Sequence, residues 1–297
     1  MLYYKSNDPF EKKISLEDAK KEYDESFPER FTLALKACLE SDEDALYIIG
    51  PSSYLFSLGG VKIAVDPQVR RASDLEKVKD AILTYFPKLS AVLISHEHDD
   101  HFCKPLARLV KHLDLCWFLP EGMGQRWVDE SELREECIRF VKQGEILHLS
   151  GVTVKVFDSP HRPFDADWDM PERGYELATE KGRVLLPGDV REYAYDQYPP
   201  LQGADICITH VWAGNDTIDG EKYLPMMEKA ADFFARFRAR AYLFAHLYEI
   251  GRSQIVMWDT SHADLLGARI RERLPEAKAL TPILGRGYRL FSLEEIK

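Results

Sequence analysis

The sequence has little cysteine, and its cysteines form no paired arrangement. Five cysteines occur among 297 residues, and no two are spaced as Cys-x-x-Cys. The odd number and wide scatter argue against a disulfide framework and against a zinc site built on thiolates. A reduced, cytoplasmic setting is therefore expected. The five positions are Cys38, Cys103, Cys116, Cys137 and Cys207.

Long apolar runs are also missing. The first residues, MLYYKSNDPFEKK, contain no apolar signal core. No segment approaches the roughly 20 consecutive apolar residues that a membrane-spanning helix needs. The sequence therefore predicts neither export nor insertion into a membrane.

Positive charge is in deficit. Lys and Arg total 39 against 50 Asp and Glu, which gives a formal net charge of -11. Nucleic acids and anionic membranes attract electropositive surfaces, so this balance disfavours both as partners. It favours a small-molecule substrate, and an anionic one is compatible because a locally positive pocket would not show in the net charge. The sequence leaves open whether the chain forms a homo-oligomer.

The chain does have enough apolar material for a full core, since 45% of its residues are hydrophobic. Helical and strand-like segments alternate, which is typical of α/β or α+β layered folds. The first 45 residues differ, because they carry two helical patterns at about 15–26 and 29–40. We predict an N-terminal helical extension over 1–45 and one domain over 46–297. An arm packed on the domain is favoured for the extension over a lid or a dimer contact.

Short apolar and β-branched runs predict the strands of the domain, and helical spacing predicts its helices. The predicted strands are 45–49, 54–58, 61–65, 91–95, 115–119, 146–149, 152–157, 175–179, 184–186, 206–209 and 241–245. The predicted helices are 74–85, 105–112, 131–137, 223–237 and 261–274.

The run LISHEHDDHF carries most of the functional information. His96 and His98 alternate at the end of a predicted strand, so both imidazoles can point the same way. Asp100 and His101 follow where the chain turns towards a helix, whose first turn suits Pro105. Imidazole and carboxylate together are typical ligands of Zn²⁺, Mn²⁺ or Fe. A polar, solvated turn is the plainer interpretation, but three histidines and two aspartates directly after a buried strand disfavour it.

This run resembles the His-x-His-x-Asp-His motif of the metallo-β-lactamase superfamily. Four further positions fit the superfamily's motif order, namely Asp66 in VKIAVDP, His161 in VKVFDSPHRP, Asp189 in RVLLPGDV and His246 in AYLFAHLYE. The resemblance covers roughly residues 46–290. It implies an α/β (α+β) fold, the four-layered αβ/βα sandwich, with metal ions at one edge between two sheets. The order of the later elements is similar to the L-ascorbate-6-phosphate lactonase-like subgroup.

The resemblance implies a site for two divalent metal ions, Zn or Mn by preference, with Fe as an alternative. Asp66 would orient the motif loop through hydrogen bonds without binding an ion. Glu97 and Asp99 would point away from the ions. The implied ligands are His96, His98 and His161 for one ion, Asp100, His101 and His246 for the other, and Asp189 as a bridge between them.

Further polar residues are candidates for catalysis or substrate contact. Asp100 would lie near the activated water and could orient it or take its proton. His210 is a candidate general acid, although a structural loop position is an equally open interpretation. The candidate substrate contacts are Arg162, Trp212, Asn215 and His262, with a structural position favoured for the last.

The implied reaction is hydrolysis of a small ester, lactone or phosphodiester by a metal-bridging hydroxide, because metal binding lowers the pKa of water towards about 7. One alternative is a nuclease or RNA-processing phosphodiesterase on the same fold, which would need a basic groove. The other is a mononuclear-iron oxidoreductase of the same superfamily, which the residues leave open.

Overall fold

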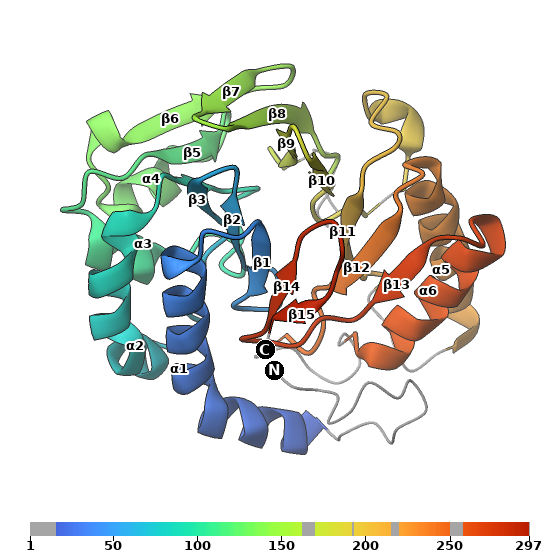
Figure 1. Cartoon of the computed structure of the whole chain (residues 1–297), viewed down its shortest axis with the longest axis horizontal. Helices are drawn as coiled ribbons and strands as arrows, with labels where there is room; N and C mark the ends of the chain where they lie inside the picture. Colours follow the sequence, from blue (N-terminus) through green and yellow to red (C-terminus); the bar gives the residue numbers. More distant parts are fainter. Residues whose placement is uncertain (1–15, 162–169, 192, 215–219, 250–257, 297) are drawn as a thin grey trace.

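The computed structural model describes residues 16–161, 170–191, 193–214, 220–249 and 258–296. Its strands form two mixed sheets that pack face to face, and helices cover the outer side of each sheet (Figure 1). The layers are thus helix, sheet, sheet and helix. This arrangement confirms the four-layered αβ/βα sandwich predicted from the sequence.

The first sheet has eight strands and begins as an antiparallel meander. Its strands are β1 (Ala45–Ile48), β2 (Tyr54–Leu58), β3 (Val61–Val65), β4 (Ala91–Leu93), β5 (Trp117–Pro120), β6 (Ile138–Val141), β14 (Gly287–Arg289) and β15 (Glu295–Ile296). Their order across the sheet is β15-β14-β1-β2-β3-β4-β5-β6. The strands from β3 to β6 are parallel, so their carboxyl ends lie at the same edge.

The second sheet has seven strands and repeats this plan. Its strands are β7 (Ile146–Leu149), β8 (Val152–Asp158), β9 (Arg173–Thr179), β10 (Gly182–Leu186), β11 (Ile206–His210), β12 (Ala241–Ala245) and β13 (Lys278–Leu280). Their order is β13-β12-β11-β10-β9-β8-β7, antiparallel from β7 to β10 and parallel from β10 to β13.

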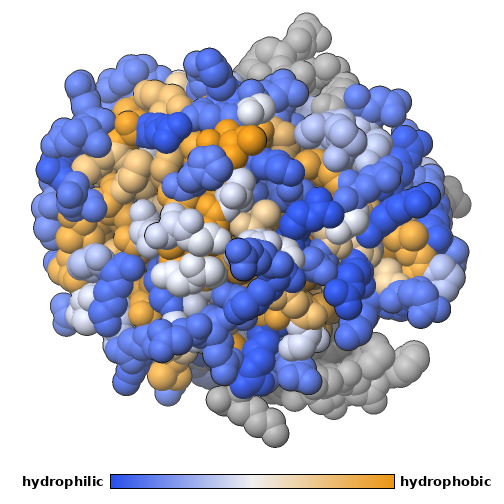
Figure 2. All heavy atoms as spheres, turned by 45° about the horizontal axis from the view of Figure 1, so that its top comes forward, coloured by the Kyte–Doolittle hydropathy of each residue, from blue (hydrophilic) through white to orange (hydrophobic). Residues whose placement is uncertain are grey.

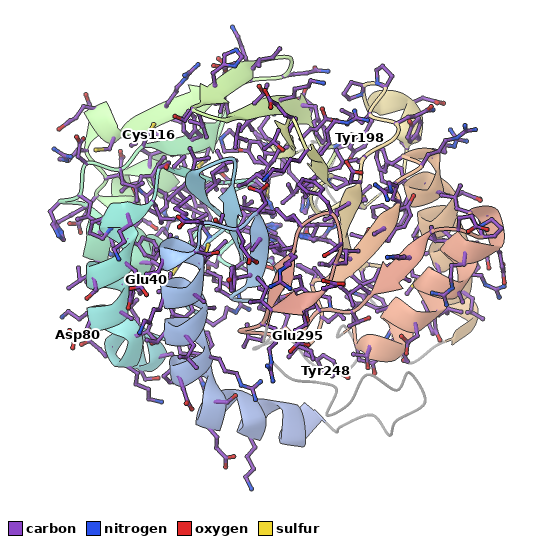
Figure 3. The ribbon with its side chains drawn as sticks, in the orientation of Figure 1. Glu40, Asp80, Cys116, Tyr198, Tyr248 and Glu295 are labelled. Atoms are coloured by element: carbon purple, nitrogen blue, oxygen red, sulfur yellow. The ribbon has the colours of Figure 1, made fainter. Side chains whose placement is uncertain are left out.

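Helices cover the outer faces of both sheets (Figure 1). The first sheet is covered by α1 (Leu16–Glu40), α2 (Ala72–Tyr85), α3 (Lys104–Val110) and α4 (Gln125–Ser131), and the second by α5 (Gly220–Arg236) and α6 (Thr260–Arg273). Charged side chains such as Asp80 on α2 point outwards (Figure 3). No helix in the described part of the chain combines the length and apolar character that crossing a bilayer requires.

Alternate residues of the central strands enter two different hydrophobic clusters. In β11, Ile206 and Ile208 belong to the cluster between the sheets, whereas Cys207 belongs to the cluster beneath the helices. In β12, Leu243 faces the other sheet and Tyr242 lies in the cluster beneath the helices. Because both faces of each strand are buried, these strands read in the sequence as continuous apolar runs.

The N-terminal extension is one helix, so the prediction of two helices is wrong. α1 runs through Pro28, and its axis bends along its length (Figure 1). Proline removes a backbone donor and usually kinks a helix. Here Phe27 and Phe31 are both buried on either side of the proline, so packing against the domain holds the turns together. These contacts also agree with the packed-arm interpretation.

The helix predicted at 131–137 is also wrong. α4 lies earlier in the chain and ends at Ser131, after which Glu132 adopts a left-handed conformation with φ of 56°. The residues that follow form a short 3-10 turn and then β6. β6 adds to β5 as a parallel edge strand, and this tertiary pairing overrides the helical propensity of ELREEC.

The molecular surface is mostly hydrophilic, as the charge composition requires. Figure 2 shows apolar patches separated by hydrophilic residues on the face turned towards the viewer. The exposed large hydrophobic residues in the described part of the chain are Leu33, Phe140, Ile146 and Leu224.

Candidate metal centre

The side chains of the sequence motif follow strands from both sheets. The loop 96–101 comes after β4 in the first sheet, whereas Asp189 and His246 come after β10 and β12 in the second. Because parallel strands run in the same direction, their carboxyl ends meet at one edge of the sandwich. The fold therefore brings residues up to 150 positions apart to one place, as the separation of His96 and His246 shows.

Three histidines form a first trio, defined here as His96, His98 and His161. One ring nitrogen from each lies within 4.8 Å of the others. Nε2 of His96 is 2.9 Å from Nδ1 of His98. Both His96 and His161 are fully buried. These nitrogens thus converge closely enough to share one ion, since zinc lies about 2 Å from each nitrogen ligand.

A buried carboxylate that the sequence does not reveal supports this trio. Oε1 of Glu172 lies 3.4 Å from Nδ1 of His96, and Oε2 lies 3.3 Å from Nδ1 of His161. Oε1 also accepts a hydrogen bond of 2.7 Å from the backbone N–H of Asp189. Glu172 directly precedes β9 and follows residues 162–169, which the structure does not describe. No motif in the sequence marks Glu172.

The second trio, defined as Asp100, His101 and His246, also gathers its ligand atoms within 4.8 Å. Nε2 of His246 lies 3.4 Å from Oδ2 of Asp100. Oδ2 of Asp189 lies 3.6 Å from Nε2 of His101 and 3.5 Å from Nε2 of His246. Asp189 also groups with His96 and His101 within the same 4.8 Å limit, so its carboxylate stands between the two trios.

A second glutamate, Glu249, lies beside the second trio and was not anticipated. It is buried, with Oε2 placed 3.7 Å from Nε2 of His246 and Oε1 placed 3.2 Å from the guanidinium of Arg70. Its position three residues after His246 is the only hint that the sequence offers. The ion pair between Glu249 and Arg70 places the positive charge of Arg70 close to the second trio.

Asp66 contacts the start of the motif loop through its carboxylate. Its Oδ1 accepts a 2.7 Å hydrogen bond from the backbone N–H of Ser95, and its Oδ2 accepts one of 2.6 Å from the Ser95 hydroxyl. Oδ2 is also 2.7 Å from Nδ1 of His101. These contacts hold the start of the motif loop and leave Nε2 of His101 facing the second trio.

The charges in the cluster are strongly interdependent. Burial, followed by the charges of His101 and His161, lowers the pKa of His96 well below its usual value. Burial and then His161 lower the pKa of His98 to about 4. Burial alone would lower the pKa of His101 as well, but Asp189 and Asp66 outweigh it and raise that pKa well above its usual value.

For the carboxylates of Asp189 and Asp100, burial and the histidine charges act on the pKa in opposite directions. Burial alone would raise the pKa of Asp189, but His246 and His101 outweigh it and hold that pKa well below its usual range. Burial is likewise outweighed at Asp100, where His246 and His101 lower the pKa. The neighbouring histidines therefore favour the ionised form of both carboxylates.

Backbone conformations at the centre are unusual. Asp66 and His246 both have positive φ, at 46° and 65°, which non-glycine residues rarely adopt. Gly188 has a φ of 90°, and a Cβ there would lie 2.5 Å from Oε1 of Glu172. The residue before Asp189 must therefore be glycine if Glu172 is to reach the Asp189 amide. Strain of this kind is typical of sites where function fixes the geometry.

The remaining candidate residues from the sequence lie in different surroundings. His210 is buried, and its Nδ1 lies 2.6 Å from Oδ1 of Asp189. Trp212 stacks beneath the guanidinium of Arg191 at 5.2 Å. His262 lies in the first turn of α6, where it completes a capping box with Asp259. Arg162 and Asn215 lie outside the described residues.

The neighbours of the motif histidines point away, as the resemblance implies. Oε2 of Glu97 accepts a 2.9 Å hydrogen bond from the backbone N–H of Gly124, and the side chain of Asp99 is 73% exposed.

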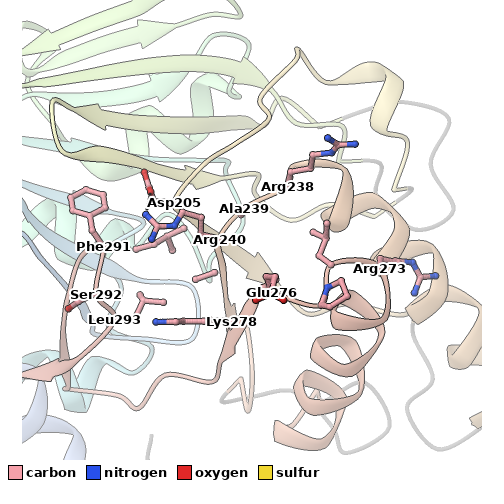
Figure 4. Close-up of a pocket in the computed structure, with 15 residues that line it drawn as sticks. Asp205, Arg238, Ala239, Arg240, Arg273, Glu276, Lys278, Phe291, Ser292 and Leu293 are labelled. Atoms are coloured by element: carbon pink, nitrogen blue, oxygen red, sulfur yellow. Dashed lines mark hydrogen bonds and ion pairs between the residues drawn. The ribbon is translucent and has the colours of Figure 1, made fainter.

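A cavity of about 520 Å³ lies at the opposite ends of the parallel strands (Figure 4). It is lined by the amino-terminal residues of β11, β12 and β13, and by the β14–β15 turn at Phe291 and Leu293. In Figure 4, Lys278 and Arg240 extend towards this turn, whereas Arg238 and Arg273 point away. No residue of either trio lines this cavity, so it is separate from the metal centre.

Comparison with known proteins agrees with this geometry. A family model described as the β-lactamase superfamily domain matches residues 45–232, more than half of the chain. No curated protein sequence matches.

Among solved structures, the chain is similar to three proteins of low sequence identity. Igni18, a metallo hydrolase from the archaeon Ignicoccus hospitalis, has 17% identity and a TM-score of 0.57, with 82% of this chain and 97% of that one covered. The metallo-β-lactamase fold protein YhfI from Bacillus subtilis has 15% identity and a TM-score of 0.56, covering 82% and 98%. CmlA, a diiron β-hydroxylase from Streptomyces venezuelae, has 16% identity and a TM-score of 0.58, covering 84% and 55%. At these identities the likeness shows the fold alone.

Proposed function

The chain belongs to the β-lactamase superfamily and has the metallo-β-lactamase fold, and on this basis we propose that it is a metal-dependent hydrolase with two divalent ions. The first trio would hold one ion and the second trio the other. Asp189 would contact both.

The observation that carries this proposal is the hydrogen bonding of two buried imidazoles. Nε2 of His101 and Nε2 of His161 are buried without a hydrogen-bond partner in the described part of the chain. A buried polar atom without a partner costs free energy, and a bound cation removes that cost. Each nitrogen lies within 4.8 Å of other ligand atoms, and imidazole with carboxylate suits Zn, Mn or Fe.

The chemistry follows from what two cations and this chain's residues can each supply. The bound ions would lower the pKa of water and polarise the oxygen of a substrate. Asp100 is buried and stays ionised because His246 and His101 depress its pKa. It can therefore accept a hydrogen bond from a water molecule and orient it. His96 and His98, whose pKa values burial lowers, would stay neutral and bind an ion.

The proposed substrate is a small ester, lactone or phosphodiester. The acidic net charge of -11 supports a small molecule over a nucleic acid. Neighbouring structures include proteins described as a metallo hydrolase and as an isothiocyanate hydrolase. The likeness to the ascorbate-6-phosphate lactonase subgroup is part of this proposal, as is a cytoplasmic location, which the five free cysteines support.

An iron-dependent oxidation is the second candidate, because one neighbouring structure is a diiron β-hydroxylase. Metal analysis of the purified protein decides between the two candidates. Two equivalents of Zn or Mn, with hydrolysis of bis(p-nitrophenyl) phosphate or of a lactone panel, would support the hydrolase. Iron with substrate-dependent oxygen consumption would replace it with the oxidation.

Two variants test the ligand assignment directly. His96→Ala and Asp189→Ala should each lose metal and activity together, because each removes a proposed ligand. Lys79→Ala on α2 is a control, since its side chain is 43% exposed and pairs with Glu76, which belongs to neither trio. Full metal content in both ligand variants would refute the assignment.

A further inference from the structure

Two buried polar side chains from opposite sheets stand behind Asp189. Tyr54 lies in β2 and His210 ends β11, and both are nearly inaccessible to solvent. The Tyr54 hydroxyl is 2.7 Å from Nε2 of His210. On the other side of the ring, Nδ1 is 2.6 Å from Oδ1 of Asp189. The three groups form a chain that spans the space between the sheets.

The direction of each hydrogen bond follows from the groups themselves. An ionised carboxylate has only lone pairs to offer, so the proton of the 2.6 Å contact belongs to Nδ1 of His210. In a neutral imidazole the other nitrogen is then an acceptor. The Tyr54 phenol, whose type has an ordinary pKa of about 10, keeps its proton at neutral pH and donates it to Nε2. Tyr54 thereby fixes the tautomer of His210.

The hydrogen bonds from Tyr54 to His210 and from His210 to Asp189 determine which oxygen of Asp189 is left to face the trios. Oδ1 is held by His210, while Oδ2 lies 3.6 Å from Nε2 of His101 and 3.5 Å from Nε2 of His246. We propose that Tyr54 and His210 are positioning residues that hold Asp189 so that Oδ2 faces both trios. This inference rests on the proposed function, and it gives His210 a role other than the general acid considered from the sequence.

The surroundings explain why solvent would not substitute for this pair. Tyr54 belongs to the apolar cluster between the sheets. The cavity lined by Tyr54, Asp66 and His210 has a volume of only about 10 Å³, which is at the limit for a single water. If His210 were replaced, Asp189 would have no substitute donor here, and the Asp189 carboxylate could rotate.

The test uses side chains that keep or lose one donor at a time. His210→Asn retains an N–H close to the position of Nδ1, whereas His210→Gln carries its amide further out, and His210→Ala has none. Tyr54→Phe removes only the hydroxyl. Tyr242→Phe is the matched control, because Tyr242 is equally buried but donates to Phe234 beneath the helices.

The readout is the affinity for Zn²⁺, measured by competition with a coloured chelator, with circular dichroism to check folding. Loss of a residue that orients a metal ligand typically weakens metal binding about 10- to 100-fold. We expect this loss in His210→Ala and His210→Gln, a loss of about tenfold in Tyr54→Phe, and near-normal affinity in His210→Asn and Tyr242→Phe. In steady-state assays the weakened variants, loaded with excess metal, should lose kcat with little change in KM.

Some outcomes would contradict the positioning role, and another would contradict the proposed function itself. Wild-type affinity in folded His210→Ala or His210→Gln would overturn the positioning role, and so would equal affinities for the Asn and Gln variants. A general acid would instead give His210→Asn with normal metal content, low kcat and a missing limb in the pH profile, which also overturns it. A wild-type protein that binds no metal would refute the proposed function itself.

Discussion

At the scale of single residues, a ligating histidine is oriented by whatever its second ring nitrogen contacts. Here those partners come from distant parts of the chain. Asp66 contacts His101 across 35 positions, and Glu172 lies beside His96 and His161. Motif order predicts Asp66 from the sequence. It cannot predict Glu172, because only the pairing of β8 with β9 brings that carboxylate behind the first trio.

Replacing Glu172 tests its contribution to metal binding. Glu172→Gln keeps the size of the side chain and an acceptor for the Asp189 amide but removes the negative charge beside His96 and His161. We expect Zn²⁺ affinity to fall at least about tenfold, as is usual for such partners. Chelator competition measures it, with Glu176→Gln as control, because Glu176 is a buried glutamate of the neighbouring β9 paired with Lys155. Equal affinities in the two variants would contradict the role.

The lowered pKa of His98 predicts how stability depends on pH without metal. Burial and His161 lower this pKa from 6.5 to about 4. Between those values the unfolded chain binds a proton that the folded chain does not, so His98 makes stability rise with pH across this window. Urea unfolding of metal-free protein at pH 4 to 7 should therefore show a steeper slope for the wild type than for His98→Asn. Identical slopes would show that His98 titrates normally.

At the scale of elements, the sequence predicts most strands of the two sheets but misses four short ones. The predicted 54–58, 61–65, 146–149 and 241–245 coincide with β2, β3, β7 and β12. β6, β13, β14 and β15 were not predicted, because each has only two to four residues. Their residues carry no alternation long enough to recognise.

The packing of α1 predicts that the N-terminal extension contributes to stability. Phe31 is fully buried in the core cluster beneath the helices. Phe31→Ala should lower the free energy of unfolding by about 3 kcal/mol or more, as is usual for removing a buried ring. Urea unfolding measures this loss. Leu33→Ala in the same helix is the control, since Leu33 is 54% exposed and should change stability little. Similar effects of both changes would mean that α1 does not pack as described.

His262 offers a choice between a structural and a substrate-binding role. Oδ1 of Asp259 lies 2.8 Å from Nδ1 of His262 and accepts a 2.9 Å hydrogen bond from the N–H of Ser261. Loss of such a helix cap costs about 1 kcal/mol. Asp259, the capping residue, keeps its bond to Ser261 when His262 is replaced, so His262→Ala should lower the unfolding free energy by no more than that amount and leave KM unchanged. A raised KM with unchanged stability would restore the substrate contact considered from the sequence.

At the scale of the whole molecule, the proposed ions would connect the two halves of the sandwich. His96, His98, Asp100 and His101 extend from the first sheet, whereas His161, Asp189 and His246 extend from the second. Each trio takes ligands from both sheets. An ion bound to either trio therefore holds the sheets together at the edge where the strands end.

Removal of metal should consequently lower the melting temperature of the entire domain. A ligand that binds only the folded state stabilises it by about 2.7 kcal/mol when its concentration is 100 times its Kd. In a chain of this size that energy corresponds to a shift of roughly 5 °C. Calorimetry with and without EDTA measures the shift, and Zn²⁺ in excess should restore it. EDTA should lower the melting temperature of Asp189→Ala less than that of the wild type if the ions are the cause, because Asp189 would contact both ions. An equal drop in that variant would show that the chelator acts elsewhere.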